Sequence, residues 1–251
     1  MNTPIRMISI LALVLAATAI AQTPPPAGFE RVRIKRQDLP PYPYEMVQGG
    51  VREGQVCIAF SIDVVGKVDD CLAVAYTHPA FAQVALAAVR RWTFEPARLR
   101  GEPISTATEV TMNFEVQGTV VVSMTSGEAY AAWVNKLVGP NEGYYPRSLR
   151  ELDRIPTPIT APAPAYPNTL AARGHAGDVT VTFYIDETGS VRLPAVDSSD
   201  DVELGALAVT ALHQWKFEAP TCKGLPVLAK ASQVFRFRPS DKPAARVSGN
   251  D

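Results

Sequence analysis

Gly54-Gln-Val-Cys-Ile-Ala-Phe-Ser-Ile-Asp-Val-Val-Gly-Lys-Val68 returns later in the chain as Gly177-Asp-Val-Thr-Val-Thr-Phe-Tyr-Ile-Asp-Glu-Thr-Gly-Ser-Val191, and this repeat decides the fold. The separation of 123 residues continues through Trp92 and Trp215 to a final phenylalanine strand in each copy. Two stretches that stay in register over about 75 residues indicate a duplicated domain.

Each copy begins with the pattern of a β-hairpin. Residues 55–63 alternate between apolar and polar side chains, which is typical of a half-buried strand. Asp63 and Gly66 predict a tight turn, because aspartate can bond to the following backbone and glycine can adopt positive φ. Residues 68–75 then return as the second strand.

A helix and a last strand complete each copy. After Pro79, apolar residues recur at helical spacing and end at Trp92, and the second copy has the same intervals, ending at Trp215. Residues 110–116 then alternate as a strand, matched by Phe235 and Phe237. The predicted fold class is therefore α+β: two small β-β-α-β domains, each an antiparallel sheet with one helix packed on a face.

The regions around the two copies differ in composition. Residues 7–20 form an apolar run shorter than the roughly 20 residues that span a bilayer, and Ala19-Ile20-Ala21 is a small-x-small cleavage pattern. This predicts export to the periplasm, with an uncleaved anchor in the inner membrane as the alternative. The full expected organisation is a signal peptide (1–21), an exposed leader (22–38), domain one (39–117), a linker with a strand-like run, a short helix and a proline-rich stretch (118–162), domain two (163–240) and a disordered tail (241–251).

Charge and composition exclude several kinds of function. Cleavage would remove Arg6 and no acidic residue, so the formal net charge changes from −1 to −2, which argues against nucleic acid or anionic lipid as a partner. The histidines His78, His175 and His213 show no metal-ligand or nucleophile–base spacing, and no phosphate-binding loop is present. We therefore expect neither an enzyme nor a protein that binds a cofactor, metal or small-molecule substrate.

The complete motif resembles the TonB C-terminal domain family. It comprises Tyr-Pro, the glycine-rich entry and hairpin, a helix ending in Trp-x-Phe, Gly-x-Pro and a final phenylalanine strand. The resemblance covers about 150 residues in two tandem copies, and the second copy matches better. A typical transducer of this family also has an uncleaved anchor and a long spacer, and residues 22–38 are too short for such a spacer.

The resemblance implies that the protein binds a periplasmic partner. Family members take up an extended segment of an outer-membrane receptor as an added strand, which needs a free sheet edge. The candidate edges are the last strands, Glu109 to Val116 and Ala231 to Arg238, the second being preferred. The candidate partner-binding residues are Tyr42, Pro43, Tyr166, Pro167, Val234, Arg236 and Arg238.

A packing role competes with the binding role at the two Tyr-Pro pairs, where proline can fix the chain entry and tyrosine can cover the sheet rim. At the level of the whole protein, the alternative is a structural or scaffolding envelope protein. In that case the duplicated domains would pair with each other, or with another copy, through the same edges.

The three cysteines raise the question of a disulfide, which an oxidising compartment permits. With a turn centred near Val64, Cys57 and Cys71 are expected opposite one another on neighbouring strands, within reach of a bridge. Two unpaired small residues are the alternative. Some relatives of the resembling family also carry a cysteine on each of these strands. Cys222 has no partner in its own copy and is expected as a surface thiol, with a link to another chain as the alternative.

Overall fold

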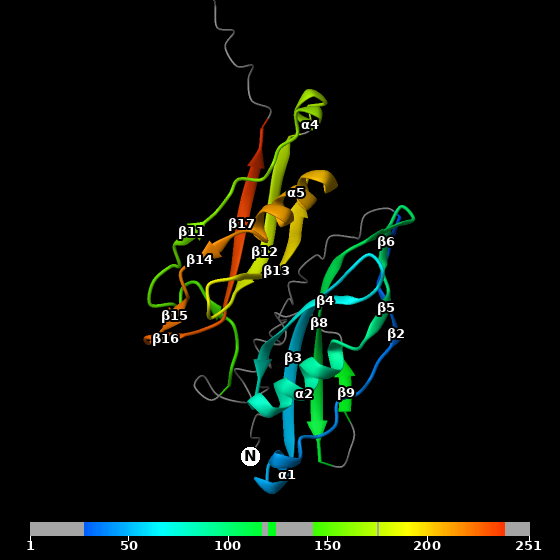
Figure 1. Cartoon of the computed structure of the whole chain (residues 1–251), viewed down its shortest axis with the longest axis vertical. Helices are drawn as coiled ribbons and strands as arrows, with labels where there is room; N and C mark the ends of the chain where they lie inside the picture. Colours follow the sequence, from blue (N-terminus) through cyan, green and yellow to red (C-terminus); the bar gives the residue numbers. More distant parts are fainter. Residues whose placement is uncertain (1–27, 117–119, 124–142, 175, 239–251) are drawn as a thin grey trace, which may run out of the picture.

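The computed structural model describes residues 28–116, 120–123, 143–174 and 176–238, and it shows two similar units (Figure 1). Each unit is a small, mainly antiparallel sheet with one main helix, so the predicted α+β class is confirmed. The predicted signal peptide, the short linker helix and the tail lie outside the described residues.

Unit one is built on a four-stranded sheet with the order β4-β3-β8-β9. Its strands are β3 (Glu53–Ile62), β4 (Val68–Tyr76), β8 (Thr106–Glu115) and β9 (Val120–Ser123). The helix α2 (Pro79–Val89) packs on one face, and the shorter α1 (Tyr44–Gln48) precedes the sheet. The core between helix and sheet contains fully buried Phe60, Phe81 and Phe114.

Unit two repeats this arrangement with the order β10-β17-β12-β13. Its strands are β10 (Arg147–Ser148), β12 (Gly177–Ile185), β13 (Val191–Ser199) and β17 (Ala229–Phe237). The helix α5 (Val202–Leu212) covers one face, and α4 (Asn168–Ala172) lies before the sheet. Asp201 caps α5 by accepting from Glu203 N at 2.7 Å, whereas His78 caps α2 by accepting from Ala80 N at 3.2 Å.

Short strands attach the leader and the linker to the units. In unit one, β2 (Arg33–Arg36) pairs with β5 (Thr93–Glu95), and β1 (Phe29–Glu30) pairs with β6 (Ala97–Leu99), which also pairs with β7 (Glu102–Ile104). In unit two, β11 (Pro158–Thr160) pairs with β14 (Lys216–Phe217), and β15 (Thr221–Cys222) pairs with β16 (Leu225–Pro226). In the described parts of the predicted leader and linker, these strands therefore extend the two units.

The hairpin turn explains why both copies keep an aspartate three residues before a glycine. Asp63 Oδ1 accepts from Val65 N at 3.0 Å and from Lys67 N at 2.8 Å. Gly66 has φ +85°, and a Cβ there would lie 1.9 Å from the Phe94 carbonyl oxygen. A side chain at this position would collide with backbone as well as strain φ, so the turn requires glycine. The turn predicted from sequence is present.

The two units pack against each other through the sheet faces that the helices leave uncovered. An inter-unit cluster joins Cys57, Ala59, Val74 and Ala75 of unit one to Tyr184, Leu193 and Leu228 of unit two. Leu193 has φ 49°, a left-handed conformation that is rare outside glycine, and it lies where the β12–β13 register shifts. A bulge of this kind re-aims side chains, and here Leu193 is directed into the inter-unit cluster.

Candidate functional site

Of the two last strands predicted as binding edges, β8 and β17, the outer edge of β17 pairs with fewer residues of a neighbouring strand. β12 pairs with β17 along its whole length from Ala229 to Phe237. On the other side, β10 pairs only with Ala229 and Lys230, in parallel. Within the described residues no strand covers the edge from Ala231 to Phe237. The predicted edge in the second copy is therefore open in the part of the chain that the structure describes.

Main-chain groups of alternate residues face this open edge. Arg147 N donates to Leu228 O at 2.8 Å, so the Leu228 carbonyl points away from β12. Because peptide groups alternate sides along a strand, the N–H and C=O of Ser232, Val234 and Arg236 also point outward. The pairing of β12 supports this direction. Asp178 lies opposite Arg236, and its carbonyl oxygen accepts from Asp200 N on the β13 side, so the main-chain groups of this residue pair do not bond to each other.

One outward carbonyl already has a side-chain partner. Gln233 Nε2 donates to Val234 O at 2.9 Å. This bond occupies an acceptor that a neighbouring strand would use, and it comes from a side chain that can rotate away. This one carbonyl is therefore satisfied in the isolated chain and can still be released to an added strand.

The outer face of β17 carries the predicted exposed side chains. Phe235 and Phe237 are buried, whereas Val234, Arg236 and Arg238 are exposed. This is the alternation that the sequence predicts for the strand. The two guanidinium groups lie close to Asp178, at 3.8 Å for Arg236 and 2.7 Å for Arg238.

Tyr166 and Pro167 lie near the far end of the same strand. The Tyr166 ring packs edge-on against Phe237, with ring centroids 5.6 Å apart. Pro167 is exposed, and its carbonyl oxygen accepts from Leu170 N at 3.0 Å where α4 begins. The structure therefore brings Tyr166 and Pro167 together with the end of β17, while giving Tyr166 a packing role as well.

Tyr42 and Pro43 have different surroundings in unit one. The Tyr42 hydroxyl donates to Val51 O at 2.8 Å, and its ring packs edge-on against Phe81 at 5.4 Å. Pro43 is buried. The nearby β8 is not open, because β9 pairs antiparallel with residues 111–114 of the predicted edge. Tyr42 and Pro43 therefore do not adjoin an open edge, in contrast to Tyr166 and Pro167.

The predicted pairing of Cys57 with Cys71 is wrong in this structure, where both are free thiols. The β3–β4 register places Cys57 opposite Ala75 and Cys71 opposite Phe60. The register shifts once between Cys57 and Ile58 and again between Phe60 and Ile62. An odd change in register moves a side chain to the other face of a sheet. Cys71 consequently lies in the helix-side core, whereas Cys57 lies in the inter-unit cluster. Burial raises the pKa of the Cys57 thiol, and nearby Glu109 raises it further.

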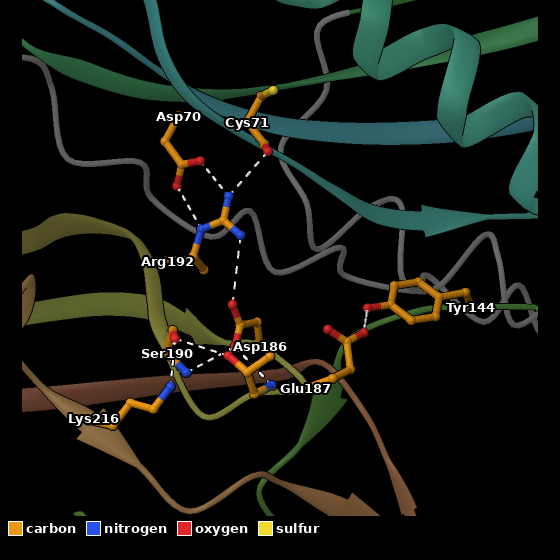
Figure 2. Close-up of polar contacts among 9 residues, drawn as sticks. Asp70, Cys71, Tyr144, Asp186, Glu187, Ser190, Arg192 and Lys216 are labelled. Atoms are coloured by element: carbon orange, nitrogen blue, oxygen red, sulfur yellow. Dashed lines mark hydrogen bonds and ion pairs between the residues drawn. The ribbon is translucent and has the colours of Figure 1, made fainter.

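Arg192 makes the most extensive polar contact between the units (Figure 2). Its guanidinium donates to both carboxylate oxygens of Asp70, with Nε–Oδ2 at 2.9 Å, and to Cys71 O at 3.3 Å. It also lies 3.7 Å from Asp186 Oδ2 of its own unit. The hydrogen bonds to Asp70 raise the pKa of Arg192, so this side chain stays charged and holds the two hairpin regions together.

Two tyrosines extend this polar contact. The Tyr184 hydroxyl of unit two donates to Glu109 Oε1 of unit one at 2.9 Å, and burial together with Glu109 raises the pKa of Tyr184. Tyr144 stacks on Tyr76 with ring centroids 4.6 Å apart, and its hydroxyl donates to Glu187 (Figure 2). A backbone bridge also joins Tyr76 and Tyr144. These contacts join the two units in addition to the apolar inter-unit cluster.

The described histidines serve as helix termini. His78 is the N-cap of α2 and His213 the C-cap of α5, while His175 lies outside the described residues. Among the described ranges, no group of three or more metal-ligating side chains comes together. None of the described helices combines the length and apolarity that crossing a bilayer requires.

Comparison with known proteins gives two kinds of similarity. The family model described as Gram-negative bacterial TonB protein C-terminal matches residues 38–116 and again residues 162–239. Among solved structures, the chain is similar to the solution NMR structure of the Pseudomonas aeruginosa TonB CTD, with 28% sequence identity and a TM-score of 0.32. That alignment covers 39% of this chain and 97% of that chain. The search of curated proteins found no match.

Proposed function

Because the chain belongs to the Gram-negative bacterial TonB C-terminal family, with two copies of the domain, we propose that it binds an extended segment of another envelope protein by strand addition to β17. An outer-membrane receptor is the partner that the family favours, which would place the protein in TonB-dependent transport. The observation that carries the proposal is the contrast between the β17 edge, open beyond Lys230 in the described residues, and the β8 edge, paired with β9.

Strand addition accounts for the features of this edge better than side-chain recognition alone. An unpaired strand edge presents a row of N–H and C=O groups that favours pairing with another chain. In β-augmentation those groups supply the affinity and alternate side chains supply the specificity. Val234 and Arg236 provide both here, since their main-chain groups point outward and their side chains lie on an exposed face.

The test is a proline substitution that removes one outward donor without disturbing the sheet. Val234→Pro deletes an N–H that faces the open edge and is not used by β12, so unit two should remain folded. Val234→Ala keeps the donor and shortens the side chain. We expect capture of the envelope partner to be lost with proline and only weakened with alanine, in pull-downs with the whole chain and circular dichroism as the folding control. Equal loss from both would replace strand addition by side-chain recognition.

A scaffolding role is the second candidate, because the open edge of β17 could equally pair with another copy of the chain. In the described part of the chain the two units contact each other through sheet faces, and neither last strand pairs with a strand of the other unit's repeat. Self-association through β17 would still leave a distinct signature. Sedimentation would then show a dimer for the native chain and a monomer for Val234→Pro, whereas envelope-partner binding requires no such dimer.

Periplasmic export belongs to the same proposal. Residues 1–21 carry the pattern of a cleaved signal peptide. Mass spectrometry of the processed protein should find Gln22 at its amino terminus. An intact Met1 in the membrane fraction would support the anchored alternative.

A further inference from the structure

The outward-facing side chains of the last strand have opposite charge in the two units. On β17 the outward positions carry Lys230, Arg236 and Arg238. On β8 the positions of the same face include Glu109 and Glu115. The offset of 123 residues aligns Arg238 with Glu115, so the charge is reversed at this matched position. The other charged residues align with uncharged ones, Lys230 with Ala107, Arg236 with Asn113 and Glu109 with Ser232, so the last strand as a whole is basic in unit two and acidic in unit one. The basic copy is the one whose edge is open in the described residues.

The positive charge on β17 is only partly balanced by its surroundings. Arg236 Nε lies 3.8 Å from Asp178 Oδ2, and Arg238 Nη2 lies 2.7 Å from Asp178 Oδ1. Two guanidinium groups thus share one carboxylate. Their side chains are 75% and 59% exposed, so both can take a further anionic partner without being uncovered first.

A strand added to β17 would place alternate side chains on this same face. Side chains directly opposite one another across neighbouring strands have Cβ atoms about 4.5–5.5 Å apart, which is within reach of an arginine–carboxylate pair. The intervening side chains would face the core side of the sheet, where β9 gives an in-chain example. Val122 of β9 lies opposite Met112 and packs against the core of unit one.

We propose that the segment bound at β17 carries acidic side chains at alternate positions, facing Arg236 and Arg238, with apolar side chains between them. This inference rests on the proposed strand addition and adds the chemistry of the partner to it. The arginines select the acidic segment by charge, and the buried Phe235 and Phe237 favour apolar residues on the opposite side of the added strand.

The experiment uses three ten-residue peptides that share valine at alternate positions and carry glutamate, glutamine or lysine at the others. Two exposed ion pairs are together worth about a tenfold change in Kd, so the glutamate peptide should bind the whole chain about tenfold more tightly than the glutamine peptide. The lysine peptide should bind most weakly. Raising the salt concentration should reduce these differences.

Two variants separate this inference from the strand addition on which it rests. Arg236→Glu combined with Arg238→Glu should reverse the order of the peptides, while Val234→Pro should abolish binding of all three. Equal affinity for the three peptides, still abolished by proline, would overturn the acidic preference and leave strand addition intact. Failure of every peptide to bind, or binding that survives Val234→Pro, would overturn both.

Discussion

The two units have the same sheet and helix but differ in what encloses them. In unit one, β9 pairs antiparallel with the last strand at residues 111–114. In unit two, the last strand is paired on its outer side only at Ala229 and Lys230 within the described residues. The elements that create this difference, β9 and β10, both come from the segment between the repeats. The repeated motif therefore sets the scaffold, and the intervening chain decides which edge stays available.

The Tyr-Pro pairs show the same divergence at single residues. Tyr42 is fixed by a hydrogen bond to Val51 O, and Pro43 is buried. Tyr166 adjoins Phe237 at the end of the open strand, and Pro167 is exposed. Both tyrosines pack on the matched phenylalanine of the last strand, Tyr42 on Phe114 and Tyr166 on Phe237, and the difference is that only the second phenylalanine ends a strand whose edge is open in the described residues.

The largest effect that should distinguish the units is at the matched glycines Gly54 and Gly177. A Cβ on Gly54 would lie 2.1 Å from the ring of fully buried Phe81, whereas a Cβ on Gly177 would lie 2.7 Å from the exposed side chain of Asp200. A buried ring cannot move aside cheaply. We expect Gly54→Ala to lower the free energy of unfolding by about 3 kcal/mol and Gly177→Ala by about 1 kcal/mol.

Denaturant unfolding of the two variants, followed by circular dichroism and by the summed fluorescence of the tryptophans, tests this difference. Similar losses of unfolding free energy in both variants would mean that Phe81 in the core moves aside as easily as the exposed side chain of Asp200. The stated contrast in packing would then be wrong.

Sequence alone predicts the repeated part of the fold. The alternation of residues 55–63, the Asp63–Gly66 turn and the apolar helix stripe report local geometry, and each copy checks the other. The cysteine pairing failed because it depends on register, and the register shifts in β3–β4 leave no separate signal in the sequence. One such shift is enough to place Cys71 on the other face of the sheet.

The closed and open edges could be predicted only in part. The apolar run of residues 119–124 predicts a strand, and β9 confirms it, but nothing local says that it pairs with β8. The contacts of Arg192 with Asp70 and of Tyr184 with Glu109 were missed, because they join residues far apart in the chain. The available signal was the type of residue. Arg192 and Tyr184 lie on the strand face that the sequence assigns to solvent, and either side chain can bond across an interface between units.

The second prediction concerns the contact that holds the units together. Tyr184→Phe removes the donor to Glu109 Oε1, and the other oxygen, Glu109 Oε2, already lacks a hydrogen-bond partner in the structure. Hydrogen bonds to charged groups contribute about 1.5–3 kcal/mol, so we expect a loss of about 2 kcal/mol. A double-mutant cycle with Glu109→Gln should show coupling between the two sites in the unfolding free energy. Additive losses would show that the two side chains act independently.

The third prediction is a pH dependence at the turn of unit two. Burial raises the pKa of Asp186, but hydrogen bonds from Thr188 and Ser190 and the charge of Arg192 outweigh it, so the pKa is lowered overall. A carboxyl group with a lowered folded-state pKa stabilises the protein above its unfolded pKa of about 3.9 and loses this contribution as the pH falls through the folded value. Stability should therefore decline below about pH 4.

Asp186→Asn provides the control for this pH effect, because asparagine cannot titrate. The variant should be less stable than the native chain at neutral pH, and the difference should narrow as the pH falls below about 4. Thermal unfolding across this range measures it. A difference that stays constant with pH would exclude Asp186 as the group responsible.

The smallest expected effect tests whether β9 is what distinguishes the two edges. Val122→Asp places a charge where a half-buried side chain packs against the core of unit one, so β9 should detach from β8. The exposed edge would then carry Glu115, while Glu109 stays bonded to Tyr184. We expect weak new binding of the valine–lysine peptide, with a preference of only about threefold over the glutamine peptide because a single exposed charge is involved.

Val122→Thr keeps the branched shape and serves as the matched control, and Val234→Pro in the same chain removes binding at β17. If the opened chain preferred the glutamate peptide, charge would not be what separates the two last strands. If it bound no peptide at all, β9 would not be what keeps unit one from taking an added strand.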